Sequence, residues 1–161
     1  MSKKILVSSC LIGKKCAYDA EARTSSSVKK LCDRFGCIDV CPEIMGGLDC
    51  PREVHEIRGG SGKEVLDGKA TVQSLSGADR TAHFIQGAKK ALKEALENDI
   101  KLAIMKSHSP SCGKKKIYSG RFDGTMRNGS GVTTVLLMRN KVKVFTEKET
   151  KKARELLESG K

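Results

Sequence analysis

The chain has 161 residues, is 38% hydrophobic and carries 31 Lys and Arg against 19 Asp and Glu, a formal net charge of +12. This length and apolar content predict one folded domain, 1–161, and exclude a disordered chain. No apolar stretch could cross a bilayer, and the run Ile5-Leu6-Val7 is too short for a signal-peptide core, so we expect a cytoplasmic protein with no membrane partner.

Strand and helix patterns alternate in the first part of the chain. Residues 4–9 have the apolar, β-branched pattern of a buried strand, and 24–35 have apolar positions at helical spacing. Gly36 ends that helix, and 38–40 form a short strand. The glycine-rich segment 46–77 is expected to be a long functional loop with little regular structure.

The second part begins with the clearest helix, 79–98, followed by a third buried strand at 101–106. The polar, glycine-rich segment 107–131 is expected to be a second loop. Residues 132–139 are ambiguous between helix and strand, and a hairpin with a strand at 141–145 is possible.

Thr146 and Glu149 have the spacing of a capping box, which predicts a final helix to about residue 158. Strands that alternate with helices favour an α/β fold. We therefore expect one open, mainly parallel sheet with helices on both faces, a Rossmann-like arrangement whose active edge lies at the carboxyl ends of the strands.

Three of the seven cysteines follow predicted strands. Cys10 comes after the first, Cys41 after the second, and Cys112 lies in the loop that leaves the third. In a reducing compartment such residues are not expected to form disulfides. A parallel sheet would bring all three to one edge, where they either share a metal site or remain three separate, reduced cysteines.

The other four cysteines have weaker signals. Cys32 is expected to pack in the core, and Cys37 has no predicted partner. Cys16 and Cys50 lie in loops at the same edge, and either is a fourth ligand, a redox partner or a simple loop residue. The ligand count matters because an iron–sulfur cluster is ordinarily held by four thiolates, so three would leave one iron open to substrate.

Several polar residues and glycines accompany the three cysteines. Glu43 is a candidate general base or a surface carboxylate. Ser109 and Ser111 either bind a substrate heteroatom or cap a turn, and Gly46 and Gly47 would permit a close approach of the backbone to a ligand.

Four further residues are candidates for the same site. Arg52 and Lys106 would neutralise an anionic group or bind substrate, unless they are ordinary surface charges. Tyr18 and Asp19 are expected to line the pocket, whereas His108 lies near it without a predicted role.

The candidate residues fall in three motifs, which are Ser9-Cys10-Leu11-Ile12-Gly13 with Cys16 and Tyr18-Asp19, then Cys41-Pro42-Glu43 with Gly46-Gly47-Leu48 and Pro51-Arg52, and finally Lys106 with Ser109-Pro110-Ser111-Cys112-Gly113. In this order the motifs resemble a small bacterial family that contains the thiouracil desulfurases. The resemblance covers almost the whole chain, since Phe122-Asp123-Gly124-Thr125 and Gly131-Val132-Thr133 also fit.

The resemblance implies a [4Fe–4S] cluster bound by Cys10, Cys41 and Cys112, with one iron free for the sulfur of a thiolated pyrimidine. It implies that C=S is replaced by C=O with sulfide release and no net redox change. Glu43 and Ser109 would then act on substrate or water, and 132–139 would be a helix.

Two other function classes stay open from the sequence. One is a metal-binding or iron–sulfur redox sensor without turnover. The other is an RNA-binding accessory protein, which the charge of +12 favours because a basic surface attracts polyanions.

Overall fold

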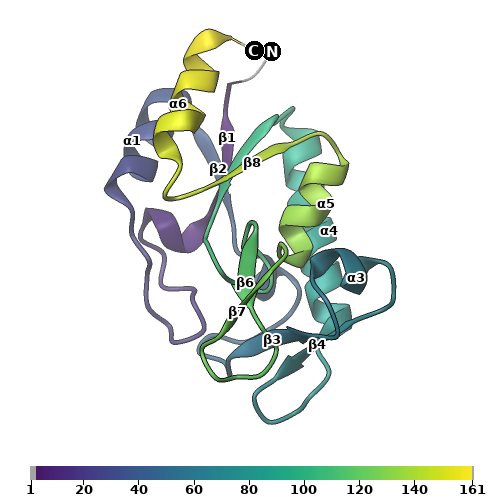
Figure 1. The fold of residues 1–161 in the computed structure, drawn as a ribbon. Coiled ribbons are helices and arrows are strands. Elements are labelled where there is room, and N and C mark those ends of the chain that lie inside the picture. The colour runs from purple at the N-terminus through teal and green to yellow at the C-terminus, as the bar shows by residue number, and fades with distance from the viewer. Residues whose placement is uncertain (1–2, 161) are drawn as a thin grey trace.

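The computed structural model describes residues 3–160, so residues 1–2 and 161 of the predicted domain 1–161 lie outside the described residues. Four parallel strands form the central sheet in the order β2–β1–β5–β8 (Figure 1). They are β1 (Ile5–Ser8), β2 (Cys37–Val40), β5 (Leu102–Met105) and β8 (Lys143–Thr146). The predicted parallel α/β sheet is confirmed.

Two pairs of helices cover the sheet, one pair on each face (Figure 1). Ile5 and Val7 of β1 share a core with α1 and α6, whereas Leu6 points to the opposite core with α4 and α5. Because both faces are covered, strands β1 and β5 are buried at every position, as expected for a parallel sheet. The four helices are α1 (Ser26–Phe35), α4 (Thr81–Glu97), α5 (Val132–Arg139) and α6 (Thr150–Ser159).

The helix ends follow from local sequence. The Ser25 side chain accepts a hydrogen bond from the Val28 amide at 3.3 Å and caps α1, and Gly36, with a φ of 79°, ends it. The ambiguous segment 132–139 is helix α5. The possible hairpin with the next strand is wrong, because β8 pairs in parallel with β5 instead.

The expectation of a structureless loop at 46–77 is also wrong. The segment contains β3 (His55–Arg58), α3 (Gly62–Leu66) and β4 (Thr71–Ser74), and it follows the short helix α2 (Pro42–Met45). The two strands form an antiparallel pair that buries its apolar side chains against Phe84 of α4. These strands are buried by a small second core, although neither of them contains the continuous apolar run by which a strand is recognised in a sequence.

The second predicted loop, 107–131, likewise holds a short antiparallel pair, β6 (Lys116–Tyr118) and β7 (Met126–Asn128). Ile117 is the only buried residue of its six, so the sequence shows no alternation to detect. The pairs β3–β4 and β6–β7 lie together beyond the carboxyl edge of the main sheet (Figure 1). None of the described helices combines the length and apolar character needed to cross a membrane.

Candidate functional site

A cavity of about 220 Å³ opens at the carboxyl edge of the sheet. Cys10, Cys41 and Cys112 all line it, so the structure brings the three predicted thiols together. Other predicted site residues in its lining are Tyr18, Glu43, Arg52, Lys106 and Ser109. The cavity is therefore the place where the sequence motifs meet.

Each of the three thiols is placed by the end of a strand. Cys10 lies in a 3-10 turn (Ser9–Ile12) directly after β1, and Cys41 directly follows β2. Cys112 lies seven residues beyond the end of β5 and is buried. Burial raises the pKa of the Cys112 thiol to about 12.

The loop that carries Cys112 is held by the start of α5. The Val132 amide donates to the Pro110 carbonyl at 2.9 Å, and the Thr134 hydroxyl donates to the Cys112 carbonyl at 2.7 Å. Gly131 has no room for a side chain, because a Cβ there would lie 2.4 Å from the carbonyl of Ser111. These contacts fix Cys112 although it is far from the strand end.

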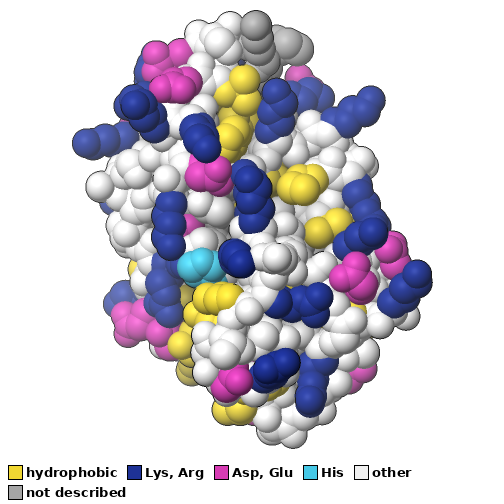
Figure 2. Space-filling model, in the orientation of Figure 1, with side chains coloured by type: hydrophobic (Ala, Val, Ile, Leu, Met, Phe, Trp, Pro, Cys, Tyr) yellow, Lys and Arg dark blue, Asp and Glu magenta, His cyan; other side chains and the backbone are white. Residues whose placement is uncertain are grey.

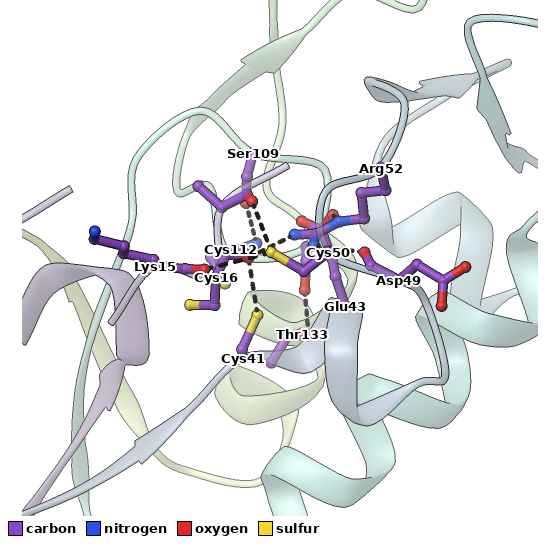
Figure 3. A network of polar contacts seen from close by, with 12 residues as sticks. Lys15, Cys16, Cys41, Glu43, Asp49, Cys50, Arg52, Ser109, Cys112 and Thr133 are labelled. Atoms are coloured by element: carbon purple, nitrogen blue, oxygen red, sulfur yellow. Dashed lines mark hydrogen bonds and ion pairs between the residues drawn. The ribbon is translucent and has the colours of Figure 1, made fainter. Parts of the chain in front are cut away.

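A fourth thiol, that of Cys16, joins the site (Figure 3). The pKa of the Cys16 thiol is raised to about 11, mainly because of its interaction with the Cys10 thiol. The pKa of the Cys41 thiol is also raised, mainly because of its interaction with Cys16. Cys16 therefore lies between two of the predicted ligands. Cys50, in contrast, is exposed and does not line the cavity.

The donor set suits a cluster better than a single ion. Within residues 3–160, no group of three or more His, Cys, Asp or Glu side chains could hold one metal ion. A zinc ion needs all its thiolates about 2.3 Å from one point. In an iron–sulfur cluster each thiolate binds a different iron, so three cysteines that line one cavity are the kind of donor set that it needs.

Glu43 is not a free surface carboxylate. Its Oε1 accepts a hydrogen bond from Nε of Arg52 at 2.9 Å, and the two side chains are only 14% and 6% exposed. Burial alone would lower the pKa of Arg52, but the Glu43 carboxylate outweighs it and raises that pKa. A permanently charged guanidinium thus holds the carboxylate at the cavity wall.

Lys106 also has a carboxylate partner. Its Nζ lies 3.4 Å from Oε2 of Glu147 and donates to the Ser107 carbonyl and hydroxyl, both at 3.2 Å. Glu147 additionally accepts from the Ser107 amide at 2.9 Å. Lys106 therefore borders the cavity with its charge already compensated.

Four predicted substrate-binding residues do not line the cavity. Asp19 lies outside and pairs with Arg23 at 2.8 Å. A Cβ on Gly46 would lie 2.0 Å from the His83 carbonyl, so this glycine permits the close approach of α2 to α4, and a Cβ on Gly47 would lie 3.6 Å from the His83 ring. Ser111 is buried, and its hydroxyl forms a 2.8 Å hydrogen bond with that of Thr133. These four residues therefore lie outside the lining of the cavity in this structure.

The cavity also contains residues that the sequence did not reveal. Arg23, His55 and Tyr118 line it, as does His108, which had no predicted role. His55 and Tyr118 were missed because their strands, β3 and β6, lie in segments read as loops. Burial lowers the pKa of both His55 and His108, which favours neutral imidazoles.

The positive charge of the chain is distributed over the outer surface. Figure 2 shows Lys and Arg side chains scattered over the visible face, with Asp and Glu between them. In the same view, a histidine and neighbouring basic side chains lie near its centre.

Comparisons with known proteins agree with this geometry. The family model described as 2-thiouracil desulfurase matches residues 5–149. The uncharacterized protein YbbK of Bacillus subtilis (strain 168) is 43% identical over 145 residues, which are 90% of this chain and 96% of that protein. A solved structure of the [4Fe–4S]-dependent thiouracil desulfidase TudS superposes with a TM-score of 0.85 at 38% identity, over 96% of this chain and 97% of the other.

The buried pair of hydroxyls predicts a stability effect at Ser111. Ser111→Ala leaves the buried Thr133 hydroxyl without its partner, which should lower the free energy of unfolding by about 1–3 kcal/mol. Adding Thr133→Val removes the orphaned group, so the double variant should be less destabilised than the two single variants summed. Urea denaturation measures both. Wild-type stability in Ser111→Ala would contradict a supporting role for this residue.

Proposed function

The chain belongs to the 2-thiouracil desulfurase family, and from this premise we propose that it replaces the C=S group of a thiolated pyrimidine, of the thiouracil or thiouridine type, by C=O with release of sulfide. The observation that supports this most is the meeting of Cys10, Cys41 and Cys112 with the Glu43 carboxylate in one cavity. We propose further that 1–161 form a single desulfurase-like domain that works in the cytoplasm, where thiols stay reduced.

The cofactor that fits this donor set is a [4Fe–4S] cluster, the group named for the structural relative TudS. Cys10, Cys41 and Cys112 would hold it through their thiolates. When bound, the cluster supplies a Lewis-acidic iron with affinity for the soft sulfur of the substrate, which makes the attached carbon more electrophilic.

In the proposed reaction, Glu43 acts as the general base. Its carboxylate takes a proton from the water that attacks the thiocarbonyl carbon. Arg52 fixes the orientation of this carboxylate through the 2.9 Å contact to Oε1. The half-buried pair thus acts as a positioned base with limited exposure to solvent.

Ser109 is placed to orient the pyrimidine ring. Its oxygen accepts a hydrogen bond from the Cys112 amide at 2.7 Å, so its own proton is available to a ring oxygen or nitrogen. Tyr18 and the neutral imidazole of His55 contribute flat surfaces to the same wall. The reaction consumes one water and releases one hydrogen sulfide, so atoms balance without any electron donor.

A sulfide-release assay tests the function directly. The protein is reconstituted anaerobically with iron and sulfide and offered free thiouracils, thiouridines and a short thiolated RNA. We expect hydrogen sulfide and the oxygenated pyrimidine in equal amounts from at least one of them. A brown, cluster-loaded protein that releases no sulfide from any of them would instead support a sensor without turnover.

The predicted ligand set can be checked by iron content. Cys10→Ser, Cys41→Ser and Cys112→Ser should each lose most of the iron and the brown colour after reconstitution, because each removes a cluster thiolate. Cys32→Ser and Cys37→Ser are matched controls outside the cavity and should keep both. Full iron loading of any of the first three variants would remove that residue from the ligand set.

The proposed base is tested by Glu43→Gln, which keeps an oxygen for Arg52 but cannot accept a proton. The variant should load iron normally and lose about 10²–10⁴-fold in kcat/KM, the usual contribution of general-base catalysis. Glu97→Gln, an exposed carboxylate on α4, is the control and should match wild type. Parental turnover in Glu43→Gln would show that another group activates the water.

A further inference from the structure

We propose that Cys16 is a fourth, displaceable thiolate ligand, which occupies the open cluster position until the sulfur of the substrate takes its place. This inference rests on the cluster of the proposed function. In this proposal Cys16 is not needed to hold the cluster in the cavity, but it controls the access of other ligands to the open iron of the cluster.

The position of the Cys16 thiol supports this role. The residue is 8% exposed, as Cys10 is, and lines the same cavity as the three predicted ligands. The Cys41 thiol lies 3.7 Å from the Cys16 carbonyl, so the two residues are in contact. No disulfide links these residues, so all of the thiols are available to metal.

The backbone around Cys16 is fixed by three side chains from the segment 41–52 (Figure 3). The Cys16 carbonyl accepts from Nη2 of Arg52 at 3.0 Å and from the Cys41 thiol at 3.7 Å. The Cys50 thiol lies 3.4 Å from the Lys15 carbonyl and 3.5 Å from that of Ala17. Since the backbone on both sides of Cys16 is held, the movement left to the residue is rotation about its single side-chain torsion.

That rotation has space on both sides. Cys16 also lines a second cavity of about 410 Å³, on the side of Ile38, Met45 and Glu94, and Cys41 borders this cavity as well. A thiol between two cavities can point to the cluster in one rotamer and to the second cavity in another. A displaceable ligand needs such a place to go, and Cys112, whose carbonyl is held by Thr134, does not border the second cavity.

The exchange is chemically balanced. The bond between the open iron and the Cys16 sulfur breaks as the bond between that iron and the substrate sulfur forms, and no electrons are transferred. The thiolate of Cys16 leaves with its electron pair and can take a proton. Because it is tethered beside the iron, its high effective concentration lets it compete with free anions and with the product hydrosulfide.

The test compares reconstituted wild type, Cys16→Ala and the control Cys50→Ser. Cys50→Ser removes a thiol from the same network but keeps a hydroxyl donor for the loop carbonyls. Iron and acid-labile sulfide are measured first, and then sodium hydrosulfide is titrated while the ultraviolet–visible and electron paramagnetic resonance spectra of the cluster are followed. Neither readout depends on turnover.

We expect Cys16→Ala to retain its iron and to bind hydrosulfide at least about tenfold more tightly than wild type, because the binding-competent open state is then fully populated. Cys50→Ser should bind as wild type does. Equal hydrosulfide affinity in wild type and Cys16→Ala would overturn the proposal, and so would an iron loss in Cys16→Ala as large as that in Cys10→Ser, since Cys16 would then be a permanent ligand. Failure of wild type itself to bind iron would instead overturn the proposed function.

Discussion

The parallel pairing of β1 with β2 on one side and β5 on the other is the constraint on which the site depends. The register aligns Ser8 with Val40 and Val7 with Ile104, so the three strands end at nearly the same level. Cys10 and Cys41 follow these ends directly. A slip of one residue would turn the buried side chains of β1 to the opposite face, and the apolar cores on both faces resist that change.

Cys112 is brought to the same place in a different way. Its loop is long, and its position depends on hydrogen bonds to the start of α5 and on the absence of a side chain at Gly131. Arg52 fixes the segments that carry Glu43 and Cys16, because its buried guanidinium binds both the Glu43 carboxylate and the Cys16 carbonyl. A buried charge is costly to leave unpaired, so loss of Arg52 would disturb both the Glu43 carboxylate and the loop of Cys16.

Much of this could be predicted from the sequence, where local pattern and topology agree. The strands at the cysteines and the helices α1 and α4 have clear periodicity, and the motif order indicated the family. The pairs β3–β4 and β6–β7 could not be predicted, because each strand is short and becomes buried only by contact with distant helices or loops. For the same reason, His55 and Tyr118 escaped notice. The local contacts of Ser111 and Gly46 could not be predicted either, because sequence proximity to a ligand does not distinguish a residue that faces the cavity from one that packs against neighbouring elements.

The electrostatics of the cavity differ from those of the surface. Arg23, Arg52 and Lys106 are the cationic side chains in its lining, and each is paired with a carboxylate, those of Asp19, Glu43 and Glu147 respectively. Burial lowers the histidine pKa values and raises that of Cys112, so these groups favour their neutral forms. The excess of positive charge therefore belongs to the outer surface (Figure 2) and not to the interior of the site. Because the cations that line the cavity are already compensated by carboxylates, we expect the proposed thiopyrimidine to be recognised by hydrogen bonds and by the affinity of its sulfur for iron.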